Sequence, residues 1–280
     1  MRRDIDTDFF APPRPRIFGH RGAAGEFPEN TTASFERAVR AGAIYLELDV
    51  HMTRDGEVVV SHDGNLARTC GRDECIRDMT WAELQTADAG YLFTTDGGET
   101  FPFRGRAIRV PRLIDVLGSF LGVNYVIEIK QTEPSVVPAL MGVIDATAMR
   151  RRVLIASEND RVVEEVRNLV PQIPTNFPYS EVAEFLQAMA GNRPGYRPRG
   201  DALQIPPEYE GWKLVSPETV DFAHRLGIEV HAWTVNDESE MNQLLDCGVD
   251  GLFTDFPARA LALTRARRVK EQGGGTRRTR

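Results

Sequence analysis

Residues 44–51 read IYLELDVH and form the centre of a longer stretch, residues 16–63, that decides the fold. Glu47 and Asp49 stand two positions apart in this run, with apolar residues between and around them. In a β-strand, residues i and i+2 point to the same side, so the two carboxylates share one face and the aliphatic side chains share the other. Two carboxylates on one face repel each other unless a cation lies between them. The stretch therefore predicts a buried strand whose polar face holds a divalent metal.

Similar strand-like runs recur along the chain and alternate with segments of helical periodicity. The expected strands cover residues 17–20, 44–51, 124–130, 152–156, 172–177, 201–205, 228–235 and 250–254. The expected helices cover residues 32–41, 112–121, 135–149, 159–170, 179–190, 217–226, 237–246 and 257–268. Regular alternation of this kind is typical of a parallel sheet with helical crossovers. Eight such units predict the α/β class and a (βα)8 TIM barrel.

Three segments fall outside this alternation. Residues 1–15 are charged and proline-rich, and we expect a flexible arm before the barrel of residues 16–264. Residues 64–106 mix charges, glycines and turn residues around one short helix at 81–89, which indicates a small insertion after the second strand. A connection of this length should have a role or a small fold of its own. Residues 265–280 are rich in Arg and Lys and predict a basic disordered tail, with weak contact to an anionic membrane surface as the alternative.

The composition narrows the possible partners and the compartment. The chain has 280 residues and a formal net charge of -7, which suits one barrel of ~250 residues and argues against nucleic acid as the main partner. It contains no apolar run of about 18 residues, so no transmembrane helix is expected. The first residues lack the apolar region of a secretory signal, and an odd, low number of cysteines suits a reducing compartment. These features predict a cytoplasmic protein and leave its oligomeric state open.

Charged and aromatic residues gather at the expected carboxyl ends of the strands, where the active sites of such barrels lie. These residues are His20, Arg21, Glu47, Asp49, Glu128, Lys130, Trp233 and Asp255. Glu47, Asp49 and Glu128 supply three oxygen ligands, which suit Mg²⁺ or Ca²⁺ better than zinc. The alternative is that these carboxylates form salt bridges with Arg21 and Lys130. Three anions inside a barrel need more than two cationic side chains to neutralise them, which favours the metal.

Arg21 and Lys130 are cations directed at the same mouth of the barrel. An arginine fork can contact two phosphoryl oxygens at once, and lysine acts as a point charge. We therefore predict that both bind a phosphate-containing substrate, a role that is compatible with ion pairs to the carboxylates. Trp233 is predicted to wall the substrate pocket, with an ordinary core position as the alternative.

The motifs in this chain resemble those of the glycerophosphodiester phosphodiesterase family, whose barrel is like that of phosphatidylinositol-specific phospholipase C. The matching segments are HRG at 20–22, PENT at 28–31, ELDV at 47–50, TRDG at 53–56, HD at 62–63, EIK at 128–130, WTVN at 233–236 and TDFP at 254–257. The resemblance covers residues 16–264. It implies the same barrel and a divalent metal held by the three carboxylates. It also implies that His20 and His62 act as general acid and base, in an order that stays open.

Neighbouring polar residues are expected to support the two histidines. Glu29 and Asn30 are expected to orient His20, or Asn30 to cap the helix that follows, and Asp63 to orient His62. An unperturbed imidazole titrates near pH ~6.5, so one histidine can be neutral and the other charged near neutral pH. No catalytic role is assigned to the remaining histidines, His51, His224 and His231.

The expected function is hydrolysis of a small-molecule glycerophosphodiester to an alcohol and glycerol 3-phosphate. A rival of the same class is a lysophospholipase D-like or sphingomyelinase D-like enzyme, in which the insertion and the basic tail would contact a membrane. A non-enzymatic rival is a phosphate-binding barrel without turnover, which would require a missing catalytic group, and none is missing from the motifs. A nucleic-acid phosphodiesterase is disfavoured by the net charge. The headgroup and the metal stay open.

Overall fold

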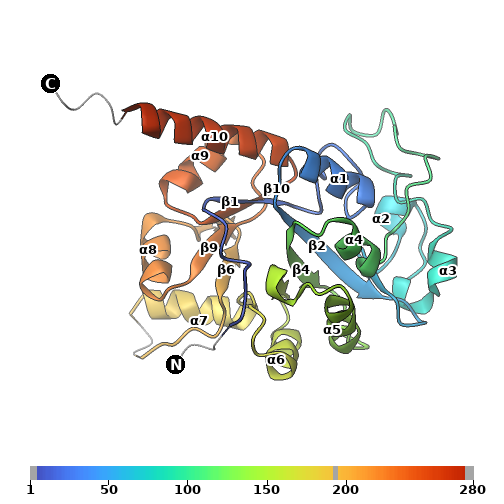
Figure 1. Cartoon of the computed structure of the whole chain (residues 1–280), viewed down its shortest axis with the longest axis horizontal. Helices are drawn as coiled ribbons and strands as arrows, with labels where there is room; N and C mark the ends of the chain where they lie inside the picture. The colour runs from blue at the N-terminus through green and yellow to red at the C-terminus, as the bar shows by residue number, and fades with distance from the viewer. Residues whose placement is uncertain (1–4, 192–194, 275–280) are drawn as a thin grey trace.

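The computed structural model describes residues 5–191 and 195–274, and a ring of parallel strands lies at its centre (Figure 1). Neighbouring strands follow the order β5-β4-β2-β1-β10-β9-β6. These strands are β1 (Arg16–Gly19), β2 (Tyr45–Met52), β4 (Asn124–Ile129), β5 (Val153–Ala156), β6 (Ala202–Ile205), β9 (Glu229–Ala232) and β10 (Gly251–Thr254). A short strand, β3 (Val58–Val60), pairs antiparallel with the end of β2.

The remaining position of the ring lies between β5 and β6. Isolated parallel bridges at Thr175 and Asn176 join this segment to the strands on either side. The strand expected over residues 172–177 is reduced to these bridges, because the Asp201 side chain takes the Thr175 N–H at 2.9 Å and Pro174 has no N–H to donate. The ring still closes, and the predicted TIM-barrel architecture is confirmed.

Helices cover the outside of the ring (Figure 1). They are α1 (Thr32–Arg40), α4 (Leu113–Ser119), α5 (Val137–Ala146), α6 (Asp160–Leu169), α7 (Tyr179–Met189), α8 (Pro217–Arg225), α9 (Glu238–Asp246) and α10 (Pro257–Gly274). Capping side chains set their starts, as where Thr31 accepts the Ser34 N–H at α1. On β2, Leu46 and Leu48 belong to the buried cluster beneath these helices. Glu47 and Asp49 therefore point to the inside of the barrel, as the period of two predicts.

Residues 5–15 pack against the barrel, so the flexible arm expected over residues 1–15 is wrong for this part. The Phe9 ring is fully buried and contacts the rings of Phe18 and Tyr45. Burial of a phenylalanine side chain contributes about 1.5–3 kcal/mol, which offsets the ordering of a charged segment. The first four residues lie outside the described part of the chain.

The segment expected to be an insertion, residues 64–106, holds short helices and a small core. Its helical turns are α2 (Ala67–Cys70), η1 (Ile76–Asp78) and α3 (Trp81–Leu84), and α3 is shorter than the expected helix. Buried side chains such as Leu66 and Leu84 form a cluster with Val59 of β3. The segment is therefore attached to the barrel through β3, next to the strand that carries Glu47 and Asp49.

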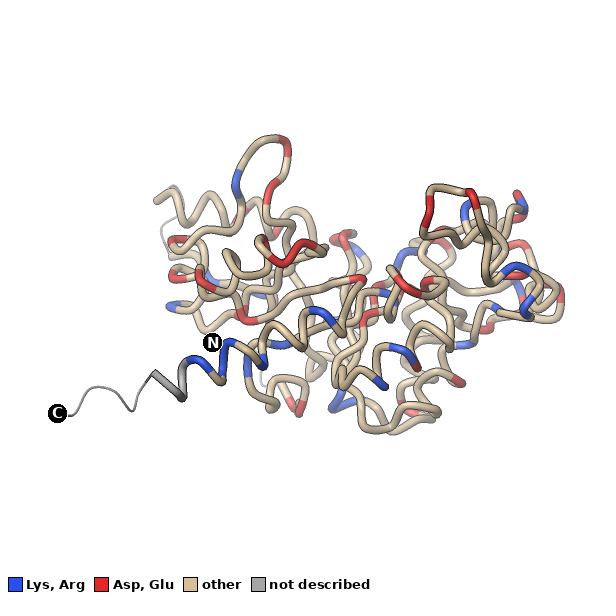
Figure 2. Tube along the Cα trace, turned by 90° about the horizontal axis from the view of Figure 1, so that it is seen from above, with Lys and Arg blue, Asp and Glu red and all other residues tan. Residues whose placement is uncertain are grey.

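Helix α10 continues into the segment that was expected to be a disordered tail, residues 265–280. Arg267 on this helix contacts Asn242 at 2.9 Å and Asp246 at 2.5 Å, both on α9. The expectation of disorder is therefore wrong up to residue 274, and residues 275–280 lie outside the described part. Figure 2 shows that Lys and Arg recur along this helix. Within the described residues, no helix combines the length and apolar character needed to cross a membrane.

Candidate active site

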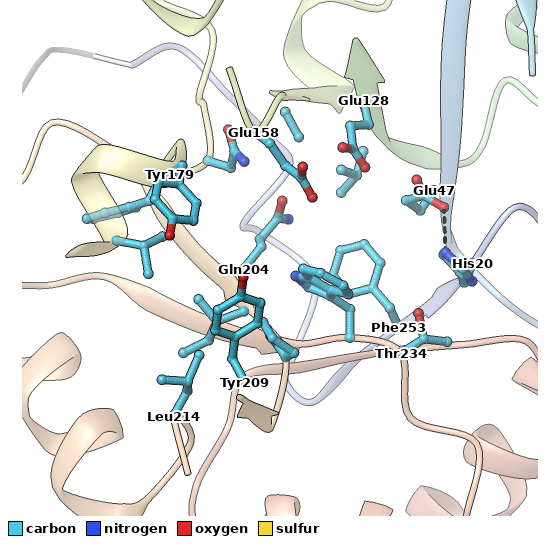
Figure 3. A pocket seen from close by; sticks show the side chains of 18 of the residues that line it. His20, Glu47, Glu128, Glu158, Tyr179, Gln204, Tyr209, Leu214, Thr234 and Phe253 are labelled. Atoms are coloured by element: carbon cyan, nitrogen blue, oxygen red, sulfur yellow. Dashed lines mark ion pairs between the residues drawn. The ribbon is translucent and has the colours of Figure 1, made fainter. Parts of the chain in front are cut away.

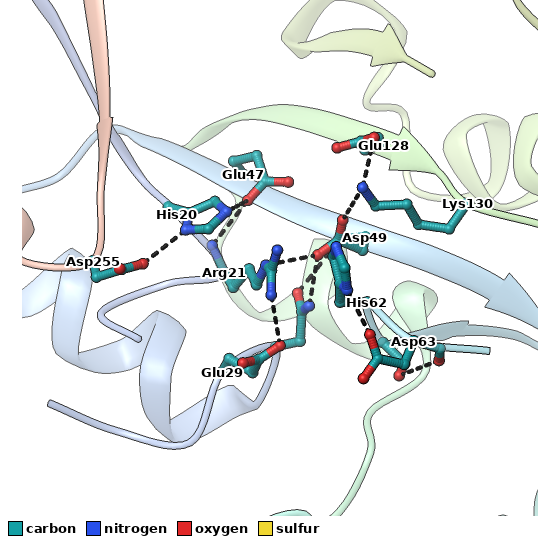
Figure 4. Close-up of polar contacts among 12 residues, drawn as sticks. His20, Arg21, Glu29, Glu47, Asp49, His62, Asp63, Glu128, Lys130 and Asp255 are labelled. Atoms are coloured by element: carbon teal, nitrogen blue, oxygen red, sulfur yellow. Dashed lines mark hydrogen bonds and ion pairs between the residues drawn. The ribbon is translucent and has the colours of Figure 1, made fainter. Parts of the chain in front are cut away.

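Three carboxylates meet inside the barrel (Figure 4). Glu47 and Asp49 lie on β2, and Asp49 pairs in register with Glu128 on the neighbouring strand β4. One oxygen from each of the three groups lies within 4.8 Å of the other two. Glu47 and Asp49 are 3% and 1% exposed, and Asp49 Oδ1 is buried without a hydrogen-bond partner among the described residues. Three hard oxygen donors, one of them a buried carboxylate oxygen without a hydrogen bond, fit a divalent cation.

The electrostatics of this cluster also favour a bound cation. Burial, followed by the charge of the adjacent Asp49, raises the pKa of Glu47, and burial also raises the pKa of Glu128. Lys130 offsets part of this repulsion, since its Nζ lies 2.7 Å from Glu128 Oε1 and 3.5 Å from Asp49 Oδ1. The salt bridges considered as the alternative are thus present, but two cationic side chains do not neutralise three carboxylates when all three are ionised.

Arg21 lies beside the carboxylates in an unusual backbone conformation. Its φ of 51° falls in the left-handed region that residues other than glycine rarely adopt. Its backbone N–H donates to Glu47 Oε2 at 2.9 Å, and its side chain lies 2.9 Å from Glu29 and 3.2 Å from Asp49. Arg21 and Lys130 both border the central cavity, so either can reach an anion that enters it.

His20 directly follows β1 and is oriented by Asp255, which directly follows the adjacent strand β10. His20 Nδ1 lies 2.7 Å from Asp255 Oδ1, and its Nε2 lies 4.0 Å from Glu47 Oε2. Asn236 holds this aspartate in turn by donating to Oδ2 at 2.6 Å. Burial opposes the charged imidazole, but the hydrogen bond to Asp255 and the charge of Glu47 outweigh it and raise the pKa of His20. Sequence reasoning noted Asp255 at a strand end and gave it no role.

Glu29 and Asn30 contact partners other than the expected one. Asn30 Nδ2 donates to Asp49 Oδ2 at 2.8 Å, and Glu29 accepts from arginine side chains. The expectation that either residue orients His20 is wrong, because an aspartate already occupies its Nδ1 atom. The expected cap is also wrong, since Thr31 and not Asn30 caps α1.

His62 lies in the loop after β3, on the side of the insertion. Its Nδ1 lies 2.7 Å from Asp63 Oδ1, so the two residues have the contact expected of them. His51 Nε2 lies 3.0 Å from the His62 carbonyl oxygen and supports the same loop. His20 and His62 border one cavity, and each has a carboxylate on Nδ1 and its Nε2 left for other partners.

Arg68, on α2 of the insertion, binds two carboxylates at once: Glu29, which contacts Arg21, and Asp63, which contacts His62. Its Nη1 and Nη2 atoms donate to the two oxygens of Glu29 at 2.6 and 2.7 Å, and its Nε donates to Asp63 Oδ2 at 2.7 Å. Glu29 in turn accepts from Arg21, and Asp63 contacts His62. Sequence reasoning missed Arg68, because spacing does not show which groups an inserted segment contacts. Its place five residues after Asp63 was the one available signal.

These groups surround one end of a cavity of about 410 Å³ (Figure 3). Trp233 borders the cavity and is 37% exposed, as a residue of a pocket wall should be. Among the lining residues that sequence reasoning missed are Glu158 after β5, Gln204 on β6, and Tyr209 on β7 (Glu208–Tyr209). The short strand β7 pairs with β8 (Trp212–Lys213) in a hairpin.

The TIM barrel, the carboxylate cluster and the cationic side chains beside it define a barrel with a candidate site for an anionic substrate. Comparison with known proteins then gives the family. The family model described as "Glycerophosphoryl diester phosphodiesterase family" matches residues 20–259, and the chain belongs to this family.

Individual relatives agree with this assignment. A glycerophosphodiester phosphodiesterase of Bacillus subtilis (strain 168) is 31% identical over 267 residues, which cover 89% of this chain and 86% of the relative. A glycerophosphoryl diester phosphodiesterase domain from Mycobacterium tuberculosis superposes with a TM-score of 0.79 at 22% identity, covering 88% of this chain and 98% of that one. An Oleispira antarctica phosphodiesterase, solved with its product sn-glycerol-3-phosphate, gives 0.71 at 24% identity, with 90% and 97% covered. At these identities the two structures show the fold.

Proposed function

We propose that the chain hydrolyses glycerophosphodiesters to an alcohol and glycerol 3-phosphate, with His20 and His62 as proton-transfer groups and a divalent metal at Glu47, Asp49 and Glu128. The observation that carries this proposal is the convergence of the carboxylates, the two cationic side chains and both histidines on one cavity. The names of the relatives and the product bound to the Oleispira enzyme support the substrate class. Location in the cytoplasm and contact of the basic segment with a membrane stay predictions.

The residues of the site divide the reaction between charge stabilisation and proton transfer. When bound, Mg²⁺ or Ca²⁺ supplies positive charge to the phosphoryl oxygens in the transition state. Arg21 and Lys130 bind phosphoryl oxygens and hold the diester in place, and a group of this kind is typically worth ~3–4 kcal/mol. Because aspartates occupy the Nδ1 atoms, each histidine presents Nε2 to the substrate. One Nε2 takes the proton of the substrate hydroxyl next to the phosphorylated carbon as that hydroxyl attacks phosphorus, and the other gives a proton to the leaving alcohol. The two histidines then exchange roles while water opens the resulting cyclic phosphate to glycerol 3-phosphate.

A panel of substrates with metal-stripped protein tests this proposal. We expect release of glycerol 3-phosphate from glycerophosphodiesters to stop in chelator and to return with Mg²⁺ or Ca²⁺. Lysophosphatidylcholine and sphingomyelin in the same panel test the lipid-directed rival. Binding of inorganic phosphate without any product release would instead support the barrel without turnover. Full activity in chelator, with no metal detected in the protein, would exclude the ligand assignment.

A further inference from the structure

The cavity has a second end, and its lining differs from that of the catalytic end. Figure 3 shows Tyr179 of α7 and Tyr209 of β7 across the cavity from His20 and Glu47, and Val182, Leu186 and Trp233 also line the cavity. Three of these five side chains are aromatic, and all three are partly exposed rather than buried in the core. The leaving alcohol of a substrate bound at the carboxylate cluster therefore has a largely apolar and aromatic surface available to it.

One acidic side chain stands at the junction of the two ends. Among the described residues, Glu158 is the charged residue that borders the cavity without belonging to the catalytic group. Its carboxylate is exposed and makes no hydrogen bond or ion pair within the described part of the chain. Figure 3 shows it between Glu128 on one side and Tyr179 and Tyr209 on the other.

The electrostatics agree with this placement. The charges of Glu210, Tyr179 and Glu158 raise the pKa of Tyr209. With the placement seen in Figure 3, the charge of Glu158 faces Glu128 on one side and the two tyrosines on the other.

We infer, on the basis of the function proposed above, that this second end binds a quaternary ammonium group on the leaving alcohol, so that the chain prefers glycerophosphocholine to diesters of neutral alcohols. In choline the cation is two carbons from the ester oxygen, which brings it from the phosphate toward Glu158 and the aromatic wall. A quaternary ammonium has no N–H to satisfy, and aromatic faces and a carboxylate stabilise it without hydrogen bonds.

Other leaving groups fit this lining less well. The hydroxyls of glycerol or inositol can pair with Glu158 and Gln204, but they gain nothing from the aromatic and aliphatic side chains that make up most of this wall. The primary ammonium of ethanolamine needs three acceptors. An acyl chain would suit the aliphatic side chains. It would also displace water from Glu158 and from the amide of Gln204, which borders the cavity, and it offers these polar groups no hydrogen bond in return. The lining as a whole suits an apolar cation.

The test compares two substrates that differ in charge and not in shape. Glycerophosphocholine and the glycerophosphate ester of 3,3-dimethylbutanol are isosteric, because a carbon replaces the nitrogen. With the metal-loaded full chain, we expect kcat/KM to be about tenfold higher for the choline ester, a typical gain from cation–π and carboxylate contacts. Glu158→Gln should lower this ratio toward one, and Tyr209→Leu should lower it more than Tyr209→Phe, which keeps the ring. Glu164→Gln, on the exposed side of α6, is the matched control and should leave the ratio unchanged.

Equal kcat/KM for the two isosteres in the unmodified chain would overturn the inference, and so would an equal loss on both esters in Glu158→Gln. A preference of more than tenfold for lysophosphatidylcholine over glycerophosphocholine would assign the second end to an acyl chain instead. If no diester is hydrolysed, the proposed function fails. The choline-binding inference is then tested separately by titrating choline chloride into the metal-free protein and following binding by saturation-transfer NMR. Binding that Glu158→Gln weakens supports the inference, and no binding at millimolar choline overturns it.

Discussion

Replacing Arg68 with alanine tests whether the insertion positions the catalytic groups. The change removes two hydrogen bonds to Glu29 and one to Asp63, all of them charge-assisted. Glu29 is then left with Arg21, and Asp63 with His62. Neither carboxylate would be tied to the insertion any longer, so the partners of Arg21 and of His62 would both be held less firmly.

The expected cost is small for folding and large for activity. The Arg68 side chain is 48% exposed, and water screens ion pairs at such positions, so the free energy of unfolding should fall by ~1 kcal/mol or less. A displacement of ~1 Å at a catalytic group can lower the rate ~10²-fold. We therefore expect kcat/KM to fall by about 10- to 100-fold, or ~1.4–2.8 kcal/mol of transition-state stabilisation.

The pH dependence gives an additional signature. Although burial opposes it, the hydrogen bonds of Arg68 hold the pKa of Glu29 and of Asp63 below their ordinary values. Without Arg68 both values rise toward the ordinary range, so a larger fraction of each carboxyl is protonated at acidic pH. A neutral carboxyl holds Arg21 and His62 more weakly, and the loss of activity should therefore be greatest on the acidic side of the pH profile.

The assay measures kcat and KM across pH for the unmodified chain, Arg68→Ala, Arg68→Lys and a control, Arg72→Ala. Arg72 lies in the same insertion and pairs with Glu74, away from the site. Arg68→Lys should recover little, since an ammonium cannot span both carboxylates as the guanidinium fork does. Added guanidinium should restore part of the activity of Arg68→Ala. Wild-type kinetics in Arg68→Ala, or an equal loss in Arg72→Ala, would refute the positioning role.

Three further results are expected. Glu128→Gln should weaken binding of Mg²⁺ or Ca²⁺, measured by calorimetry, far more than it lowers Tm, because it replaces one of three carboxylate donors in a preformed cluster with a neutral amide. Unchanged affinity would remove Glu128 from the ligand set. His20→Ala and His62→Ala should each lower kcat by ~10²–10⁴, and Asp255→Asn should lower kcat with little effect on KM. His224 lies on α8, and His224→Ala should leave both kcat and KM unchanged. Normal turnover in His20→Ala or His62→Ala would exclude that histidine from the proton-transfer pair. Burial opposes the ionised form of Glu229, but hydrogen bonds to His231 and Arg16 lower its pKa to about 2. The ionised carboxylate therefore stabilises the folded state at pH values above the ordinary pKa of glutamate, and this stability is lost as the pH falls toward 2. Glu229→Gln should accordingly lower the free energy of unfolding by on the order of 3 kcal/mol near neutral pH, and urea melts between pH 7 and 2 should show the difference shrinking in acid; a constant difference across this range would contradict the linkage.

Local periodicity was sufficient to predict the centre of the site. The spacing of Glu47 and Asp49 places both on one face of a strand by geometry alone, and the alternation of strands and helices makes β4, with Glu128, a neighbour of β2. Closure of the barrel also brings the first and last strands together, so the contact of His20 with Asp255, 235 residues away, was within reach of the same reasoning. What the strand order leaves open is which of several polar residues at two strand ends face each other.

Other contacts had no local signal. Phe9 packs under the barrel from a segment whose charges and prolines indicate a loose arm, because one buried aromatic ring outweighs the composition around it. Arg267 orders a basic helix end through α9, a partner that charge patterning cannot identify. Arg68 belongs to an insertion with no repeating pattern, and only its folded position shows that it contacts Glu29 and Asp63.

The two histidines are held by parts of the molecule that differ in their attachment. His20 and Asp255 follow β1 and β10, which pair along their whole lengths, so this histidine can shift only if the ring itself opens. His62 depends on Asp63 and, through it, on Arg68 of α2, a helix of four residues that the small cluster beneath the insertion holds in place. Regions with few buried contacts open at lower free energy than strands of a central sheet. A movement of the insertion would therefore act on His62 through Asp63 and on Arg21 through Glu29, whereas the strands β2 and β4 that carry the carboxylate cluster belong to the ring itself. We expect the insertion to influence how the substrate is aligned for proton transfer more than it influences the metal ligands.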